Sequence, residues 1–408
     1  MKCLQCEERE KGLLSMATRI ETIEAAADTL ILTSIGIEAK RCSYIRNWNS
    51  TCRACLDVCM HDAIKRSVGR ISIDSEKCTE CGACVSACPT STFVTTSPTY
   101  GQIVAAARER ASGLEGNAVF ACTRQIDTLR IDATHLVELP CLDYLDEYLI
   151  IGLFATDEVD NVVIFSGSCE GCDKDCAEPW AHTVIRSAKR LMKLWGITNH
   201  VKAYKNIPEA FILPEGKKQK QRSLPGDRRE AFADASQSAK AAIYNAASDF
   251  MSDTLGTPKR KVEDPNRQII VRLEETYPPE SYRPIRMLRM LDHLGERPYG
   301  QEVESRFWTS VANDPKRCRH CGACATMCVT GALTFEEEEI DGEKPGKKDK
   351  RVTLTFRPAL CVGCRLCKDG CLTRSMLYEN KVAADDLDDD VVRYLLKNAT
   401  PDKRKSYF

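Results

Sequence analysis

Residues 78–89 read CTECGACVSACP, with four cysteines spaced C-x2-C-x2-C-x3-C and a proline after the last. The same cysteine spacing recurs in CRHCGACATMC at residues 318–328 and in CVGCRLCKDGC at residues 361–371. A fourth run, CRACLDVC at residues 52–59, lacks the first cysteine because Asn49 stands at that position. Three thiolates in one such loop can reach three corners of a cubic iron–sulfur cluster, and the fourth ligand comes from elsewhere. We therefore expect these runs to bind [4Fe-4S] clusters.

The composition excludes several other classes of protein. The chain has 408 residues, of which 58 are basic and 59 acidic, so its charge gives no general attraction to nucleic acid. It contains no continuous apolar stretch of the ~20 residues that a membrane span needs, and no twin-arginine or apolar export segment. We therefore expect a cytoplasmic protein without a membrane span. In that setting its 23 cysteines favour metal ligation over disulfides.

A glycine lies next to the second cysteine of three runs: Gly82 and Gly322 follow it, and Gly363 precedes it. Glycine lets backbone amides approach the cluster sulfides, and such hydrogen bonds help to set the reduction potential. Zinc is the alternative metal. However, zinc sites usually pair two distant CxxC knuckles and leave no use for a third cysteine. A zinc-binding interaction protein is therefore the least favoured interpretation.

The paired runs at each end resemble the bacterial two-cluster ferredoxins, in which the last cysteine of each run crosses to the other cluster. For the C-terminal block, the resemblance implies one cluster on Cys318, Cys321, Cys324 and Cys371, and a second on Cys361, Cys364, Cys367 and Cys328. For the N-terminal block, it implies a cluster on Cys78, Cys81, Cys84 and Cys59. The resemblance thus predicts four [4Fe-4S] clusters in two blocks.

The fourth of these clusters departs from the ferredoxin pattern. It has Cys52, Cys55 and Cys88, but Asn49 stands where the family has a cysteine. We assign Cys42, the nearest available thiol, as its fourth ligand. The alternatives are a [3Fe-4S] cluster, or Cys3 or Cys6 of the isolated N-terminal CxxC as the fourth ligand.

The middle of the chain shows short apolar strands alternating with helices, a pattern typical of a parallel α/β sheet. We expect four short apolar strands, at Ala118–Ala121, Leu136–Leu139, Val162–Phe165 and His200–Ala203. We expect helices at Leu142–Ala155 and Trp180–Trp195. Five cysteines follow the ends of the first three strands: Cys122, Cys141, Cys169, Cys172 and Cys176. Ligands of such sheets bind at the carboxyl ends of the strands.

This middle stretch resembles the delta subunit of the methyl-viologen-reducing hydrogenase family. The resemblance rests on the strand ending in Cys122, the turn Leu139-Pro140-Cys141, the segment GSCEGC at residues 167–172, and the basic helix that follows. It implies a [2Fe-2S] cluster, for which we favour Cys122, Cys141, Cys172 and Cys176, with Cys169 as the alternate ligand. Gln125 stands where the family has a second early cysteine. Structural, unligated cysteines are the alternative interpretation.

The predicted fold is α+β and α/β, with two ferredoxin-like domains flanking a small parallel-sheet domain along the chain. The expected order is a helical segment at 1–39, a ferredoxin-like domain at 40–100, the α/β domain at 101–213, a charged helical and proline-rich linker at 214–311, a second ferredoxin-like domain at 312–380 and a tail at 381–408. Within this order we expect hairpins at Ile64–Ile73 and at residues 333–356, a helix at Arg229–Met251, irregular backbone at 258–298 and a surface helix or tail around Asp385–Asp390.

We find no phosphate-binding loop and no dinucleotide fingerprint, so we expect no flavin or nucleotide and no catalytic residues in this chain. The predicted function is electron transfer within an anaerobic oxidoreductase complex. The resemblance to the delta subunit implies two partners, a hydrogenase or formate dehydrogenase and a flavin-containing heterodisulfide-reductase-like subunit. The alternative is the iron–sulfur subunit of a molybdopterin oxidoreductase of the dimethyl-sulfoxide-reductase type.

Overall fold

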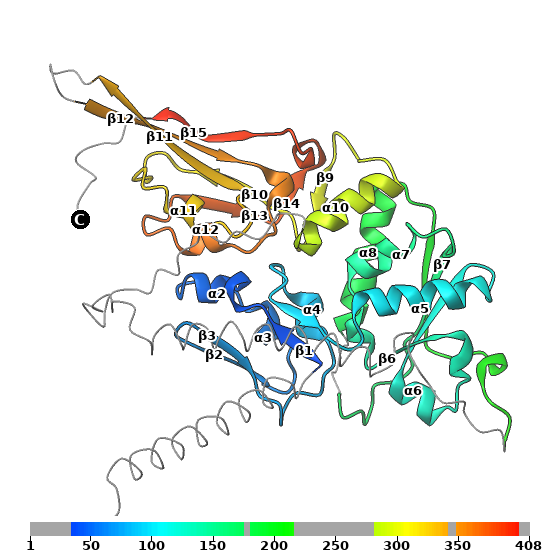
Figure 1. The fold of residues 1–408 in the computed structure, drawn as a ribbon. Coiled ribbons are helices and arrows are strands. Elements are labelled where there is room, and N and C mark those ends of the chain that lie inside the picture. The colour runs from blue at the N-terminus through cyan, green and yellow to red at the C-terminus, as the bar shows by residue number, and fades with distance from the viewer. Residues whose placement is uncertain (1–33, 175–179, 216–280, 342–347, 400–408) are drawn as a thin grey trace, which may run out of the picture.

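The computed structural model describes residues 34–174, 180–215, 281–341 and 348–399 (Figure 1). Three of the expected features lie outside these ranges: the helical segment before residue 34, the helix at Arg229–Met251, and the cysteines Cys3, Cys6 and Cys176. Within the described ranges, no helix has both the length and the apolar character needed to cross a membrane.

The first cysteine-rich block combines two small antiparallel ladders with three short helices. Its ladders pair β1 (Ile35–Ile37) with β4 (Phe93–Thr95), and β2 (Ile64–Ser67) with β3 (Arg70–Ile73). The second ladder is the predicted hairpin, and Gly69 turns it with φ +69°. The helices are α2 (Ser43–Arg46), α3 (Ala54–Asp57) and α4 (Ala83–Ala87). A small core that includes Ile35 and Phe93 packs against the cysteines.

The α/β domain contains a four-stranded parallel sheet in the order β6-β5-β7-β8. The strands are β5 (Asn117–Cys122), β6 (Val137–Leu139), β7 (Asn161–Phe165) and β8 (His200–Tyr204), so the four predicted strands are confirmed. The helices are α5 (Tyr100–Ser112), α6 (Thr123–Thr128), α7 (Glu147–Leu153) and α8 (Trp180–Leu194).

Both faces of this sheet are covered. Alternate strand residues such as Phe120 and Ile164 share a core with α5, α7 and α8, whereas Val119 and Ala121 face Ile126 of α6. The helix predicted at Leu142–Ala155 begins later than expected. Leu142–Tyr144 forms a 3₁₀ turn, and Asp146 caps α7 by accepting a hydrogen bond from the Leu149 N–H at 2.7 Å.

The second cysteine-rich block repeats the layout of the first, with a longer hairpin between its two cysteine runs. Its short ladders pair β9 (Glu302–Glu304) with β14 (Lys381–Ala383), and β10 (Ser310–Asn313) with β13 (Met376–Glu379). Its helices are α11 (Ala323–Thr326) and α12 (Leu366–Asp369). The predicted hairpin is confirmed as β11 (Leu333–Asp341) and β12 (Lys348–Phe356), with β15 (Arg393–Ala399) on the other edge of β12.

Two sequence-based expectations for the second half of the chain are wrong. Within the stretch expected to be irregular, Arg283–Leu294 forms helix α10, because Pro284 is compatible with a first helical turn and Ile285, Leu288 and Leu291 make one apolar face. That helix and Trp308 pack in the α/β core, so the expected linker does not extend over them. The expected tail contributes β14, a 3₁₀ turn at Ala384–Leu387 and β15.

The two cysteine-rich blocks flank the α/β domain in sequence but lie side by side in space (Figure 1). The first block lies below the second in this view, and the α/β domain stands beside both. Hydrogen bonds from Thr51 to Asp369 join the blocks directly. Tyr282, which precedes α10, links them indirectly, because its ring lies under the Arg41 guanidinium and its hydroxyl donates to the carbonyl of Val329. The cysteine-rich parts of the chain therefore form one continuous region.

Candidate metal centres

The first group of thiols brings Cys59 to the loop of Cys78, Cys81 and Cys84. Burial raises the pKa of Cys81 to about 11, and the neighbouring Cys59 and Cys78 contribute to that rise. Burial also raises the pKa of Cys84, with Cys81, Cys78, Cys55 and Cys59 adding to the effect. The last cysteine of the irregular run thus lies beside the other run, as the crossed arrangement requires.

The second group brings Cys42 to Cys52, Cys55 and Cys88. Burial raises the pKa of Cys55 to about 12, and Cys88, Cys52 and Cys42 add to the rise. Cys42 lies at the start of α2, where Cys42–Ser43 leads out of a 3₁₀ turn. The structure therefore places the thiol of Cys42 beside Cys52 and Cys55, whose run lacks its first cysteine, and beside Cys88 of the complete run.

The second block shows the same crossed arrangement twice. Burial raises the pKa of Cys324 to about 12, and Cys318, Cys321 and Cys371 add to the rise. In the other group, burial raises the pKa of Cys361 to about 12 with a contribution from Cys328, and it raises the pKa values of Cys364 and Cys367 as well. Each group again combines three cysteines of one run with the last cysteine of the other.

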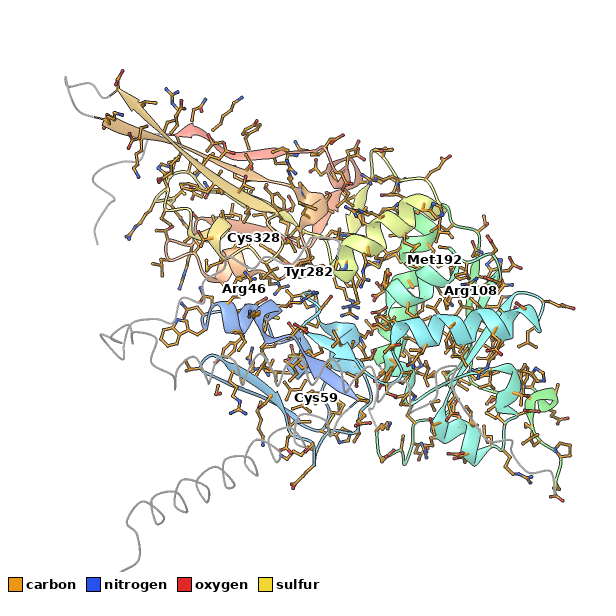
Figure 2. The ribbon with its side chains drawn as sticks, viewed as in Figure 1. Arg46, Cys59, Arg108, Met192, Tyr282 and Cys328 are labelled. Atoms are coloured by element: carbon orange, nitrogen blue, oxygen red, sulfur yellow. The ribbon has the colours of Figure 1, made fainter. Side chains whose placement is uncertain are left out.

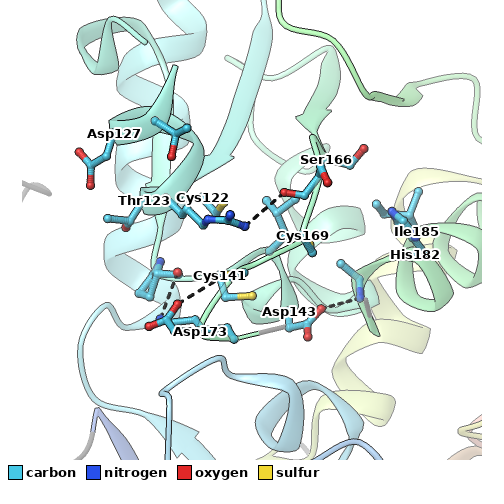
Figure 3. Close-up of a pocket in the computed structure, with 18 residues that line it drawn as sticks. Cys122, Thr123, Asp127, Cys141, Asp143, Ser166, Cys169, Asp173, His182 and Ile185 are labelled. Carbon is cyan, nitrogen blue, oxygen red and sulfur yellow. Dashed lines mark hydrogen bonds between the residues drawn. The ribbon is translucent and has the colours of Figure 1, made fainter. Parts of the chain in front are cut away.

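The middle cysteines line a cavity at the carboxyl edge of the parallel sheet (Figure 3). The cavity has a volume of about 430 Å³, and Cys122, Cys141, Cys169 and Cys172 all line it. Burial raises the pKa of Cys141, to which Asp143, Cys81 and Cys122 contribute. Four thiols that line one cavity are a suitable set of ligands for an iron–sulfur cluster.

Polar contacts hold the loops of this cavity in place. The Arg124 guanidinium donates to the Glu170 carbonyl at 2.7 Å, which fixes the loop of Cys169 and Cys172 over α6. The Lys174 ammonium donates to the Pro140 carbonyl at 3.3 Å, and Asp143 accepts from the Ala181 N–H at 2.8 Å. Gln125 is buried and packs against Gly167.

The five groups lie next to one another in a fixed order. Asp143 and Lys174 line both the middle cavity and the pocket of Cys59, Cys78, Cys81 and Cys84. That group adjoins the Cys42 group: Cys55 lies close enough to Cys84 to contribute to the rise in its pKa. The Cys42 group adjoins the Cys361 group, because Cys52 contributes to the raised pKa of Cys364. The Cys361 group in turn adjoins the Cys318 group, because Cys324 contributes to the raised pKa of Cys367.

Within the residues that the structure describes, no three His, Cys, Asp or Glu side chains are arranged to hold a single metal ion. A cubic cluster binds each thiolate through a different iron, so its ligands stand on a wider shell than those of one ion.

The glycines after the second cysteines have a steric role that spacing alone does not reveal. Gly82 and Gly322 have φ values of +81° and +68°, and a Cβ atom would lie 2.4 Å from the Tyr144 ring and 2.6 Å from the Phe335 ring. The loops of Gly82 and Gly322 therefore each pass directly over an aromatic side chain.

Hydroxyl groups beside the crossing cysteines were missed in the sequence. Thr90 lies 3.4 Å from the sulfur of Cys88, and Thr373 lies 3.5 Å from the sulfur of Cys371. The backbone N–H of Thr92 also donates to Cys88 at 3.3 Å. The sequence does carry a mark of these hydroxyls: a threonine stands two residues after the last cysteine in the runs that end at residues 88, 328 and 371.

Cys371 shows what such donors do to a thiol. Burial raises its pKa, but hydrogen bonds from the Ser375 and Thr373 hydroxyls and from the Ser375 N–H outweigh this effect and lower the pKa to about 7. The same donors would stabilise negative charge on a cluster at this position.

Two arginines cap the helix that carries Cys84 and leads to Cys88. Arg283 donates to the carbonyls of Val85 and Cys88, and Arg306 donates to those of Ser86 and Ala87. These carbonyls end α4 and have no partner within the helix. The loop into Cys88 is thereby held from the far half of the chain.

Comparison with protein families identifies two parts of the chain. A family model described as a 4Fe-4S dicluster domain matches residues 317–375, and one described as a 4Fe-4S binding domain matches residues 71–93. No curated protein and no solved structure gives a significant match. The chain therefore carries 4Fe-4S ferredoxin-type domains at two sites, and these suggest iron–sulfur electron transfer.

Proposed function

We propose that this chain is an electron-transfer subunit with four [4Fe-4S] clusters in its two ferredoxin-type blocks and one [2Fe-2S] cluster in its α/β domain. The four cubic clusters are assigned to the four crossed groups of cysteines described above, with Cys42 as the fourth ligand beside Cys52, Cys55 and Cys88. When bound, such clusters accept and release one electron at a time at potentials set by charge, hydrogen bonds and exposure.

The observation that carries this proposal is the adjacency of the five thiol groups. Electron transfer needs redox centres close to one another, whereas independent structural metal sites would need no such order. Asp143 and Lys174 stand between the middle cavity and the group of Cys59, Cys78, Cys81 and Cys84. Buried donors such as Thr90 stabilise charge at the thiolates.

The [2Fe-2S] assignment rests on the cavity at the sheet edge. Cys122, Cys141 and Cys172 line it and serve as three ligands, and the fourth is Cys176 or Cys169. Cys169 lines the same cavity, and Cys176 lies outside the described residues.

The proposed partners follow from the resemblance of the middle domain to the hydrogenase delta subunit. We assign a hydrogenase or formate dehydrogenase as one partner and a flavin-containing heterodisulfide-reductase-like subunit as the other. Substrate chemistry then takes place on those subunits, and this chain carries only electrons.

Metal analysis of anaerobically purified protein tests the cluster count. We expect about 18 irons per chain, from four clusters of four and one of two, with an equal amount of labile sulfide. Zinc without sulfide would overturn the proposal.

The middle cluster is tested separately with Cys141→Ala. This variant should lose about two irons and the EPR signal of a [2Fe-2S] cluster while the cubic-cluster signals persist. The matched control is Cys321→Ala, which should lose a cubic cluster and keep the [2Fe-2S] signal. Purification of the native complex from anaerobic cells would then show whether the two proposed partners accompany the chain.

A further inference from the structure

The seam between the two ferredoxin-type blocks is built from hydrogen bonds and close packing. The backbone N–H and the hydroxyl of Thr51 both donate to one carboxylate oxygen of Asp369, at 2.8 and 2.9 Å. Asn47 donates to the sulfur of Met327 at 3.0 Å. A Cβ atom on Gly370 would lie 2.3 Å from Met327 and 2.8 Å from Asn47, so the blocks approach there as closely as glycine allows.

A second set of contacts joins the blocks through Tyr282, which lies between α2 and the loop of Cys328 (Figure 2). Its hydroxyl donates to the Val329 carbonyl at 2.9 Å, and the Arg41 guanidinium lies 5.1 Å from the centre of its ring. Tyr282 is fully buried. The seam therefore has a buried anchor as well as its exposed hydrogen bonds.

The seam contacts fall beside cysteines on both sides. Thr51 directly precedes Cys52, and Met327 directly precedes Cys328. Asp369 lies between Cys367 and Cys371. Because the contacting residues are so close in sequence to the thiols, they bring the group of Cys52 next to the group of Cys364. The effect of Cys52 on the pKa of Cys364 agrees with this proximity.

We propose that Thr51 and Asp369 are positioning residues that hold the cluster sites of Cys52 and Cys364 together, so that electrons cross directly between the two blocks at this seam. The inference rests on the proposed function and adds the route. One electron leaves the cluster site of one block and reduces that of the other, with no bond broken and no proton moved. The α/β cavity is then one end of the series, and the group of Cys318, which includes the exposed Cys321, is the other.

The route is tested by removing one cluster site at a time from the full-length protein reduced with dithionite. Neighbouring reduced clusters interact magnetically, and this interaction weakens steeply with distance. Cys364→Ala should therefore narrow the EPR signals of the first block, because their nearest partner across the seam is lost. The matched control, Cys321→Ala, removes the far cluster site of the same block and should leave those signals unchanged.

The positioning role is tested with Asp369→Ala, which removes both hydrogen bonds from Thr51. This variant should keep its full iron and sulfide content but lose part of the magnetic interaction between the blocks. Asp57→Ala is the matched control, because Asp57 is also an acidic residue between two cysteines and its carboxylate pairs with Arg53 of its own block. Thr51→Val, which removes the hydroxyl donor alone, should give a smaller loss.

Each outcome bears on the inference. Unchanged first-block signals in Cys364→Ala, or equal signals in Asp369→Ala and Asp57→Ala at full iron content, would overturn the route and leave the proposed function standing. Wild-type protein without iron and sulfide would overturn both.

Discussion

The guanidinium of Arg283 and the carboxylate of Asp146 form an ion pair in which the two side chains are only 7% and 3% exposed. The Tyr100 hydroxyl donates to the same carboxylate oxygen, and Arg283 also donates to the Val85 and Cys88 carbonyls. The pair thus joins α10, α7 and α5 to the loop that ends in Cys88.

Replacing Arg283 by methionine should strongly destabilise the protein. The change removes the positive charge that pairs with the buried Asp146 carboxylate and the donors to two helix-end carbonyls. Breaking a buried ion pair in this way costs roughly 3–5 kcal/mol. Urea unfolding of the anaerobic protein would measure the loss. Arg108→Met, which removes a surface pair with Glu158, is the control and should cost under about 1 kcal/mol.

Replacing Thr90 by valine should lower the reduction potential of the cluster site that contains Cys88. The hydroxyl lies within hydrogen-bonding distance of the thiol sulfur, and loss of a donor disfavours the more negative, reduced state. A net hydrogen bond of about 1 kcal/mol corresponds to a shift of roughly 40 mV for one electron. An EPR-monitored redox titration would resolve it. Thr334→Val, on an exposed strand pair away from the cysteines, should shift no potential.

Replacing Cys42 by alanine should affect one cluster only. Because Cys42 lies with Cys52, Cys55 and Cys88, its loss should remove up to about four irons or leave a three-iron cluster. Iron analysis and EPR of the oxidised protein distinguish these results, since a [3Fe-4S] cluster gives a signal in that state. A variant with the full iron content and unchanged spectra would show that Cys42 is not a ligand.

Replacing Gly322 by alanine should destabilise the second block. The position has φ +68°, which costs about 1–2 kcal/mol for a residue with a side chain, and the new methyl group would overlap the Phe335 ring. Gly331→Ala is an informative control, because it shares a positive φ of +70° but has open space around the added Cβ. The difference in the free energy of unfolding between the two variants isolates the effect of the ring.

Short-range features of this fold follow closely from the sequence. The cysteine spacing predicts the crossed groups, since a ferredoxin loop needs its last thiol at the other site. The four strands of the α/β domain are apolar runs bounded by turn residues, and each forms within a residue or two of its expected ends.

Long-range features do not follow in the same way. Thr51 and Asp369 are 318 positions apart, and nothing in either residue's neighbourhood marks its partner. Helix α10 was missed because prolines on both sides suggested irregular backbone, although its apolar positions repeat at helical spacing. Cys42 could be assigned to the group of Cys88 only as the nearest available thiol, because the cysteine spacing does not encode how the chain from β1 into α2 brings it there.

The arginines that cap α4 have a consequence for how the protein is made. Both cysteine runs of the first block are synthesised before residue 90, but Arg283 and Arg306 follow roughly two hundred residues later in the chain. The first block is therefore finished only when the second half of the chain arrives. A product truncated before residue 281 would carry the cysteines of the first block without the arginines that hold the loop into Cys88.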